Sequence, residues 1–340
     1  MPPPTDGERS RPAAGGGHSG LGFRGPVCLL EHWPEEISRI DSAVGNSSAS
    51  KRHKCRAPEL RLPCSILVAA APRCVHRGLM KAVILAAGKG TRMKELTSEL
   101  PKPMLKVQGK PILEHILEGL MAAGIHEIFV VTGFRPEVIE SHFGDGSKWN
   151  ARIAYGRQAV QDGTGKAPEV AKEFVGSSSF LLTYGDILVK PETYRQMIHR
   201  FNEGAFSALV TVTRGEDVTK GGLNFFDEQF CLKRILEKPD PEQLEQLRRE
   251  GWLKPNAPVW YNAGVYIFQP SLFSFTARLR KSPRGEYELT DAVNSLLAAN
   301  HRIAGLEIQG RWVDVRDPET LARLRSEETS NTQHRTPHIQ

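Results

Sequence analysis

The sequence predicts an α/β fold in which a mostly parallel central sheet carries helices on both faces. Two patterns within its 340 residues support this class. Short apolar runs such as 81–85 and 127–131 have the length of buried strands, whereas the apolar residues of 111–123 recur at helical spacing. From Met80 onward, strands and helices of these kinds alternate, which is typical of parallel sheets.

This alternation covers the first half of the expected domain and then changes. Strands are expected over 81–85, 127–131, 153–158 and 180–182, and helices over 111–123, 136–143, 167–175 and 191–202. Strands 208–213, 222–226, 231–236 and 261–268 then follow one another around a charged helix, 241–249. We therefore expect a small antiparallel annex that carries part of a substrate pocket. Helices 271–280 and 289–299, strand 302–308 and helix 318–325 complete the expected elements.

The first 79 residues differ in composition from the rest of the chain. They are rich in Pro, Gly, Ser and Arg without sustained periodicity, which predicts a disordered N-terminal extension. The abrupt change at Met80 raises the hypothesis that Met80 is the native start. The basic run 51–54 and the apolar run 65–71 loosely imitate a signal peptide, but they are short and far from the N-terminus, so export is not expected. The predicted organisation is an extension over 1–79, one domain over 80–326 and a polar tail over 327–340.

Bulk composition excludes several classes of function. The apolar fraction of 39% and charged fraction of 25% are those of an ordinary globular protein. Of the net charge of +6, +4 falls within residues 1–79, so the domain lacks the dense basic face of a nucleic-acid-binding protein. Only Cys231 follows residue 79, which argues against a disulfide framework and predicts a cytoplasmic setting. No apolar run reaches 18 residues, so no membrane contact is expected.

The strongest local signal is the glycine-rich segment 85–93, which directly follows the first strand. Glycines at a strand end let backbone N–H groups approach a polyphosphate closely. A dinucleotide-binding fingerprint would need a third glycine, and a Walker loop would need Ser or Thr after the Gly-Lys pair; both are missing here. A plain structural turn remains an alternative for the isolated glycine motif.

A second motif, Pro101-Lys102-Pro103-Met104-Leu105, follows the glycine segment, and the two motifs together are far more specific than the first alone. G-x-G-T-R-M followed by P-K-P-M-L resembles the sugar-1-phosphate nucleotidylyltransferases, and the resemblance extends from Met80 to about Arg325. It implies a Rossmann-like nucleotidyltransferase fold and two catalytic cations at the reacting phosphates, Arg92 and Lys102. Fixed cations suit this chemistry because negative charge builds up on crowded phosphate oxygens. The loop residues implied to bind the nucleotide are Leu85, Ala87, Gly88, Gly90 and Thr91.

The segment 158–167 is similar to the part of the family that reads the nucleobase, Q-x-x-x-x-G-T-x-x-A. The resemblance assigns Gln158, Gly163 and Thr164 to the nucleotide, since an amide side chain offers both a donor and an acceptor to a pyrimidine edge. Lys166 departs from the small residue or histidine usual in the family, which leaves the base preference open. Without the family context, this stretch is a polar loop that caps a helix.

Two aspartates are implied to hold Mg²⁺. Asp186 ends an apolar strand, and Asp314 lies in a W-x-D element, Trp312-Val313-Asp314. Carboxylate oxygens are the hard ligands that Mg²⁺ prefers between phosphates. An aspartate that follows a strand is, taken alone, more often a helix cap or a turn former than a metal ligand.

The resemblance assigns the sugar to a further set of residues in the later strands, namely Gly222, Glu237, Lys238 and Asn262. Glu237 can accept hydrogen bonds from hydroxyl groups, and Lys238 can pair with the sugar phosphate. The pair Glu237-Lys238 could also be an exposed strand end. In the segment 287–291, Glu288 is a candidate for the sugar pocket and Thr290 for a helix cap.

The implied reaction transfers a nucleoside monophosphate from a nucleoside triphosphate to a sugar 1-phosphate and releases pyrophosphate. UTP is favoured slightly over dTTP, with glucose 1-phosphate or N-acetylglucosamine 1-phosphate as acceptor, and GTP with mannose 1-phosphate is a weaker option. No hexapeptide repeats are visible, so acetyl transfer is not expected. The first alternative is a non-catalytic regulatory subunit that binds nucleotide-sugar. A cytidylyltransferase of isoprenoid synthesis ranks below it. The oligomeric state stays open, with a homo-oligomer as one option.

Overall fold

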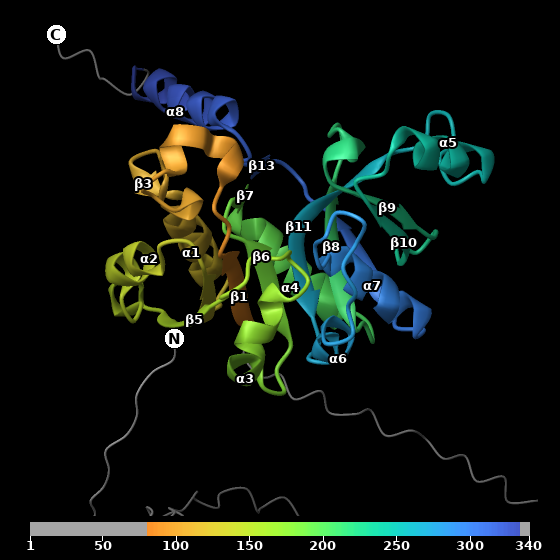
Figure 1. The fold of residues 1–340 in the computed structure, drawn as a ribbon, viewed down its shortest axis with the longest axis horizontal. Helices are drawn as coiled ribbons and strands as arrows, with labels where there is room; N and C mark the ends of the chain where they lie inside the picture. Colours follow the sequence, from red (N-terminus) through yellow and green to blue (C-terminus); the bar gives the residue numbers. More distant parts are fainter. Residues whose placement is uncertain (1–79, 334–340) are drawn as a thin grey trace, which may run out of the picture. The chain divides into compact units, whose positions relative to one another are not determined.

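A computed structural model describes residues 80–333, so the expected extension over 1–79 and the end of the polar tail lie outside the described residues. Nine strands of this part form one mixed sheet (Figure 1). Seven of them follow one another in the order β10 (Leu232–Glu237), β9 (Gly222–Phe226), β11 (Trp260–Phe268), β6 (Phe180–Tyr184), β1 (Lys81–Ala86), β4 (Glu127–Thr132) and β5 (Arg152–Arg157). The other two are β8 (Ala208–Thr213), which pairs with β11, and β12 (Ile303–Glu307), which pairs with β8.

Strand β1 lies between β4 and β6 and is parallel to both. Its side chains alternate between two hydrophobic clusters, with Ala82 and Ile84 in one and Val83 in the other. Because of this two-residue period, alternate side chains of β1 pack against opposite faces of the sheet. Burial on both faces explains why β1 is a continuous apolar run rather than an alternating one.

Helices cover both faces of the sheet, as the fold class predicts. The first cluster contains apolar residues of α1 (Ile112–Ala122), α2 (Pro136–Phe143), α4 (Pro191–Asn202) and α8 (Pro318–Gln333). The second contains residues of η4 (Ala167–Ala171), α3 (Lys172–Val175), α6 (Leu272–Thr276) and α7 (Leu289–Ala298). Two buried layers on either side of one sheet confirm the predicted α/β class.

The expected antiparallel annex is continuous with the central sheet. Strand β11 pairs antiparallel with β6, and β8 and β9 pair antiparallel with β11. Helix α5 (Pro241–Arg249) starts with a capping box between Asp240 and Gln243 and packs Leu247 against Leu223 and Phe225. Figure 1 shows α5, β9 and β10 at the opposite end of the sheet from α2 and β5.

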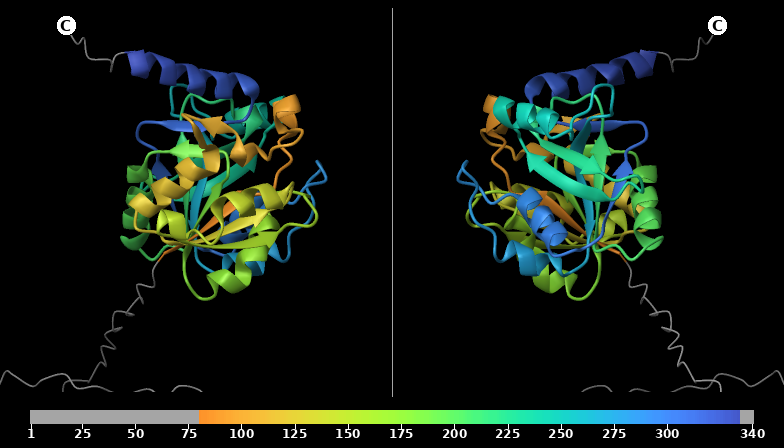
Figure 2. Two further views of the ribbon diagram at one scale, coloured as in Figure 1. Left: turned by 90° about the vertical axis from the view of Figure 1, so that its left-hand side faces the viewer. Right: turned by 90° about the vertical axis from the view of Figure 1, so that its right-hand side faces the viewer.

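Several boundaries differ from expectation for local reasons. The segment 167–175 begins as the 3-10 helix η4, with a proline in its first turn, and only then becomes α3. The expected helix 271–280 ends at Thr276, and α8 continues to Gln333 along the edge formed by η1 (Thr91–Thr97) and β2 (Figure 2). The short strand pairs were not expected, because two or three residues carry no readable period; they are β7 (Ile187–Val189) with β13 (Trp312–Asp314) and β2 (Lys106–Val107) with β3 (Lys110–Pro111).

Three short 3-10 helices complete the described part of the chain, η2 (Lys102–Met104), η3 (Ser147–Trp149) and η5 (Val218–Lys220). Between residues 80 and 333, every helix is too short or too polar to cross a lipid bilayer.

Ile116 of α1 provides a test of the first cluster. It is 2% exposed, so Ile116→Ala should lower the free energy of unfolding by about 2–5 kcal/mol through lost burial and a residual cavity. Urea denaturation measures this directly. Glu118→Ala, at an exposed position of the same helix, should change it by less than about 0.5 kcal/mol. Equal effects of the two substitutions would contradict the packing described.

Candidate active site

Two neighbouring parallel strands end at the same edge of the sheet and bring their following loops together. Leu85 of β1 lies opposite Tyr184 of β6, and the backbone N–H of Gly185 donates to the Leu85 carbonyl at 2.9 Å. The glycine loop after β1 and Asp186 after β6 are therefore adjacent. In α/β proteins, ligands bind outside the carboxyl ends of parallel strands.

A distant segment adds the second aspartate. Strand β13 pairs antiparallel with β7, which places Asp314 opposite Ile187. The backbone N–H of Val315 donates to the carbonyl of Asp186 at 3.0 Å. The two predicted magnesium ligands thus lie close together, Asp314 in β13 and Asp186 directly before its partner strand β7, although they are far apart in the sequence.

These loops surround a cavity of about 580 Å³. Its volume is within the range of sites for small molecules. All of the residues predicted to act on phosphates, nucleotide or metal line it, namely Leu85, Ala87, Gly88, Gly90, Thr91, Arg92, Lys102, Gln158, Gly163, Thr164, Asp186 and Asp314. One cavity therefore brings together residues from five separate segments of the chain.

The glycine loop is held by its own backbone and by Lys102. The carbonyl of Gly90 accepts hydrogen bonds from the Met93 N–H at 2.8 Å and from the Thr97 hydroxyl at 2.9 Å. Gly90 has φ +64°, and a Cβ there would lie 3.0 Å from the Cβ of Lys102. Only glycine meets both conditions without strain, so the loop and the lysine are packed against each other.

Lys102 connects the loops that follow β1 and β6. Its side chain is 12% exposed, and its Nζ donates to Asp186 Oδ2 at 2.5 Å. The flanking residues Pro101 and Pro103 fix the backbone of η2 at this point. Arg92 lines the same cavity from η1, at an exposed position.

The two aspartates form a local concentration of negative charge. Burial, and then the charge of Asp186, raise the pKa of Asp314 to about 6, while Lys102, Arg316 and Arg92 oppose the shift. Like charges in a partly buried site favour a bound cation, which would stabilise both ionised carboxylates. No cluster of three or more His, Cys, Asp and Glu side chains suited to a metal occurs in residues 80–333, so the predicted donor set is limited to the aspartate pair. Two carboxylates fit Mg²⁺, which commonly completes its coordination with water and substrate phosphates.

The predicted base-reading residues are held against the start of α7. The Nε2 atom of Gln158 donates to the Gly163 carbonyl at 3.2 Å, and Thr164 Oγ1 accepts from the Leu289 N–H at 3.3 Å. A Cβ at Gly163, where φ is +123°, would lie 2.2 Å from the carbonyl oxygen of Tyr287. The atypical Lys166 does not line the cavity; its ammonium group bonds to Glu169 and to a backbone carbonyl instead.

The four predicted sugar residues lie beside the cavity rather than in its wall. Gly222 is opposite Glu237 in the β9–β10 pair, and a Cβ at Gly222 would lie 2.9 Å from the Cβ of Asn262. Lys238 follows Glu237, with its ammonium group 4.0 Å from the Glu237 carboxylate. Their assignment to a sugar stays a prediction.

Two tyrosines connect this set with the cavity. Tyr184 lines the cavity and makes an edge contact with the ring of Tyr266, whose hydroxyl accepts from Asn262 Nδ2 at 2.7 Å. Burial raises the pKa of Glu237, with Lys238 opposing the shift. Arg284 also approaches Glu237, at 3.8 Å, and pairs with Glu288 at 2.7 Å.

Some cavity residues were missed by sequence reasoning. Arg316 is the clearest case: it follows the W-x-D element by two positions and faces the cavity from a segment with no regular period. Its proximity to Asp314 in the sequence was the only available signal. The other missed wall residues are Ala86, Lys89, Pro103, Gln161, Ala167, Tyr184, Gly185, Ile187 and Glu286.

The two loop glycines provide a matched test of the cradle geometry. Gly90→Ala should lower the free energy of unfolding by about 1–2 kcal/mol, because alanine is strained at positive φ and would press on Lys102. Gly88→Ala should not lower it, since a Cβ at Gly88 meets nothing within 4 Å. Chemical denaturation of both variants measures the difference. A cradle that tolerates both substitutions equally would be incompatible with the contact between Gly90 and Lys102.

Known proteins share this architecture and sequence. The nucleotidyltransferase Agl11 of Haloferax volcanii, named for low-salt glycan biosynthesis, is 34% identical over 245 residues, covering 71% of this chain and 64% of that protein. The UTP–glucose-1-phosphate uridylyltransferase AglF of the same organism is 29% identical over 261 residues, covering 75% of this chain and all of that protein. A crystal structure of UDP-glucose pyrophosphorylase with UDP-glucose superposes with a TM-score of 0.64 at 22% identity, over 76% of this chain and 100% of that one, which supports the fold alone.

Some relatives are longer than the matched region. The chain spans between about half and two thirds of the length of several curated relatives. The family itself is shown by a match over residues 81–331 to the family described as nucleotidyl transferase. With the strand ends, the cradle and the aspartate pair in place, this match shows that the chain belongs to the nucleotidyl transferase family.

Proposed function

We propose that this protein transfers a nucleoside monophosphate from a nucleoside triphosphate to a sugar 1-phosphate, giving a nucleotide-sugar and pyrophosphate. The observation that carries the proposal is the meeting of Arg92, Lys102, Asp186 and Asp314 around one cavity with a glycine cradle. Both cations and both acids are present, which is what catalysis needs and what a purely regulatory subunit could lack.

The charges of the cavity suit this reaction. An oxygen of the sugar phosphate attacks the α-phosphorus in line while pyrophosphate leaves, so negative charge increases on oxygens that are already crowded. Backbone N–H groups of the loop 87–90 would bind the triphosphate, and Arg92 and Lys102 would stabilise the growing charge. The position of Lys102 is set before substrate arrives by its bond to Asp186, so little reorganisation of this charge is needed during the reaction.

The same site is suited to a magnesium ion. Asp186 and Asp314 would hold it, since both carboxylates face the cavity and their mutual repulsion favours a cation there. When bound, Mg²⁺ supplies charge neutralisation between the phosphates. Lys102, which pairs with Asp186, would keep this carboxylate oriented and still have N–H donors for a phosphate.

For the nucleobase, Gln158 and Gly163 support a pyrimidine, with UTP slightly favoured over dTTP. Gln158 is 8% exposed and already fixed by its bond to the Gly163 carbonyl, so it can present a defined edge to the base. The similarity to AglF, which is named as a UTP–glucose-1-phosphate uridylyltransferase, supports UTP and glucose 1-phosphate. N-acetylglucosamine 1-phosphate is the other acceptor proposed, with Gly222, Glu237, Lys238 and Asn262 around the sugar.

The reaction can be tested by measuring pyrophosphate release in the presence of Mg²⁺. The substrate grid pairs each of UTP, dTTP, GTP, CTP and ATP with several sugar 1-phosphates. We expect release with UTP or dTTP and with glucose 1-phosphate or N-acetylglucosamine 1-phosphate. Chelation of Mg²⁺ should abolish it, and addition of Mg²⁺ should restore it. Folded protein that releases no pyrophosphate in any combination would contradict the proposal and favour a regulatory subunit.

The metal assignment has its own test in Asp186→Asn. Removing one carboxylate should lower kcat by roughly 10²–10³-fold, because charge stabilisation at the reacting phosphates is lost. Isothermal titration with Mn²⁺ as a probe should show weaker ion binding in the same variant. Asp227→Asn is a suitable control, since Asp227 pairs with Lys233 away from the cavity. Wild-type ion binding in Asp186→Asn would remove Asp186 from the metal site.

A further inference from the structure

Arg316 is a cation in the cavity wall with no role in the function proposed so far. We propose that Arg316 binds the phosphate group of the sugar 1-phosphate and so orients the attacking oxygen. The inference rests on the proposed function and extends it, because it adds a second cation, besides Lys238, for the phosphate of the acceptor.

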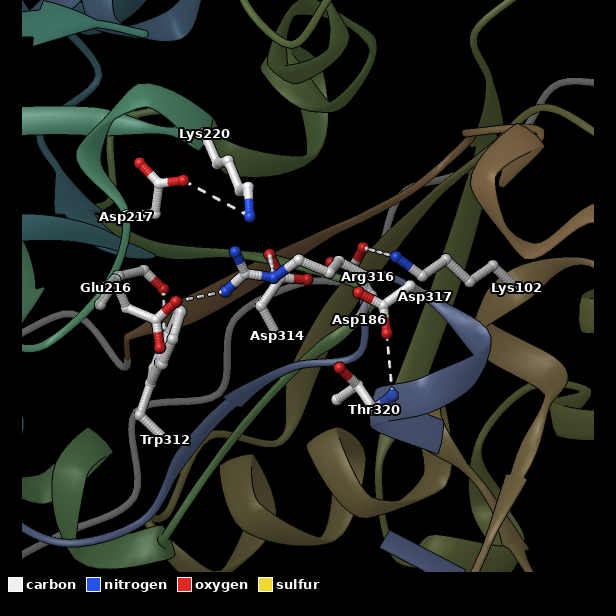
Figure 3. Close-up of polar contacts among 11 residues, drawn as sticks. Lys102, Asp186, Glu216, Asp217, Lys220, Trp312, Asp314, Arg316, Asp317 and Thr320 are labelled. Atoms are coloured by element: carbon white, nitrogen blue, oxygen red, sulfur yellow. Dashed lines mark hydrogen bonds and ion pairs between the residues drawn. The ribbon is translucent and has the colours of Figure 1, made fainter. Parts of the chain in front are cut away.

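The guanidinium group of Arg316 is held in a fixed orientation from several sides. Its Nη2 donates to Glu216 Oε2 at 2.6 Å, and its Nε lies 3.5 Å from Asp314 Oδ2 (Figure 3). The ring of Tyr261 lies 6.0 Å from the guanidinium carbon. With only 18% of the side chain exposed, these contacts leave Arg316 little rotational freedom.

The segments that carry these groups are themselves anchored. Asp217, next to Glu216, accepts from the Thr219 N–H at 3.1 Å and caps η5. Asp317, next to Arg316, accepts from the Thr320 N–H at 2.8 Å at the start of α8. The pair of Arg316 and Glu216 therefore joins two fixed backbone segments, and the arginine is preorganised for a ligand.

Part of the guanidinium group is available to a ligand. Arginine has five N–H donors in a planar fork, which matches the oxygens of a phosphate. The contacts described use Nη2 and Nε, and Nη1 donates no hydrogen bond to any residue of the described part of the chain. A phosphate could therefore bind without breaking the pair with Glu216.

The position of Arg316 lies between the two halves of the proposed site. On one side it follows Asp314, a proposed metal ligand, by two residues. On the other side its guanidinium carbon lies 6.0 Å from the ring of Tyr261, whose pKa is raised by burial and also by the charge of Glu237, a member of the proposed sugar set. A sugar 1-phosphate that reaches from the sugar set to the metal must place its phosphate between these halves.

The step that Arg316 would assist needs no proton transfer to or from the arginine. One oxygen of the sugar phosphate forms a bond to the α-phosphorus of the nucleotide, and the bond from that phosphorus to the bridging oxygen breaks. The electron pair leaves with pyrophosphate. Arg316 keeps its charge throughout and acts by binding and orientation.

The test compares the two substrates in Arg316→Gln. With the sugar 1-phosphate identified by the substrate grid, the KM for that acceptor should rise about 10- to 100-fold, as expected for a lost hydrogen bond to a charged group. The Kd of the Mg²⁺–nucleoside triphosphate complex, measured by titration calorimetry, should change less than about twofold. Arg316→Lys should recover part of the loss, because it restores the charge but not the fork.

Arg214 offers a matched control. It is also paired with a glutamate, Glu307 at 2.7 Å, and also lies over an aromatic ring, Trp260 at 4.8 Å, but it does not line the cavity. Arg214→Gln should leave the KM for the sugar 1-phosphate unchanged. Glu216→Gln keeps the size of the side chain and removes the charge that holds Arg316. It should raise the KM for the sugar 1-phosphate by a smaller factor than Arg316→Gln does. It also tests the proposal if the Arg316→Gln variant does not fold.

The outcomes separate the two proposals. An active wild type whose Arg316→Gln variant keeps its acceptor KM, or loses nucleotide or Mg²⁺ affinity instead, would overturn the role of Arg316 alone. If that variant does not fold, an unchanged acceptor KM in Glu216→Gln would overturn it. A wild type that is inactive across the whole substrate grid would overturn the proposed function itself.

Discussion

The structure depends on keeping two carboxylates together at the edge of the sheet. Asp186 and Asp314 repel each other, and this repulsion together with burial raises the pKa of Asp314 to about 6. Such an arrangement persists only where the surrounding structure compensates for it. The hydrogen bond between the Val315 N–H and the Asp186 carbonyl holds the two backbones in register, and Lys102 and Arg316 supply opposing charge.

Cationic side chains of the protein nearly balance the negative charge of the carboxylates in the cavity wall. Four cationic side chains line the cavity, namely Lys89, Arg92, Lys102 and Arg316, and three carboxylates face it, those of Asp186, Asp314 and Glu286. The wall therefore has little net charge before substrate binds. A triphosphate and a sugar phosphate would add several negative charges, so a divalent cation at the aspartate pair suits the electrostatics of the filled site.

Close backbone packing keeps these charges in place. Gly90 allows Lys102 to pack against the glycine loop, and Gly163 allows the segment 158–167 to pack against the backbone of Tyr287. In both cases a side chain would collide with a neighbouring segment. The proposed nucleotide end of the cavity is thereby joined to the start of α7, where the N-cap residue Glu288 pairs with Arg284 beside the proposed sugar residues. Nucleotide and sugar would thus be bound by parts of the fold that are in direct contact.

The sequence alone determined the α/β class and most of the strands and helices, and it predicted the residue types that line the cavity. It could do so because burial on both faces of a strand produces a continuous apolar run, as in β1, and because the spacing of the glycine and Pro-Lys-Pro motifs is local. It missed β7 and β13, whose three residues carry no period, and it treated the antiparallel strands as an annex although they continue the sheet. Only the tertiary structure decided that Asp314 pairs with the strand after Asp186 and that Arg316 faces the cavity between Glu216 and Asp314. These contacts join residues far apart in the chain, and no local pattern in a single sequence records which distant strands pair.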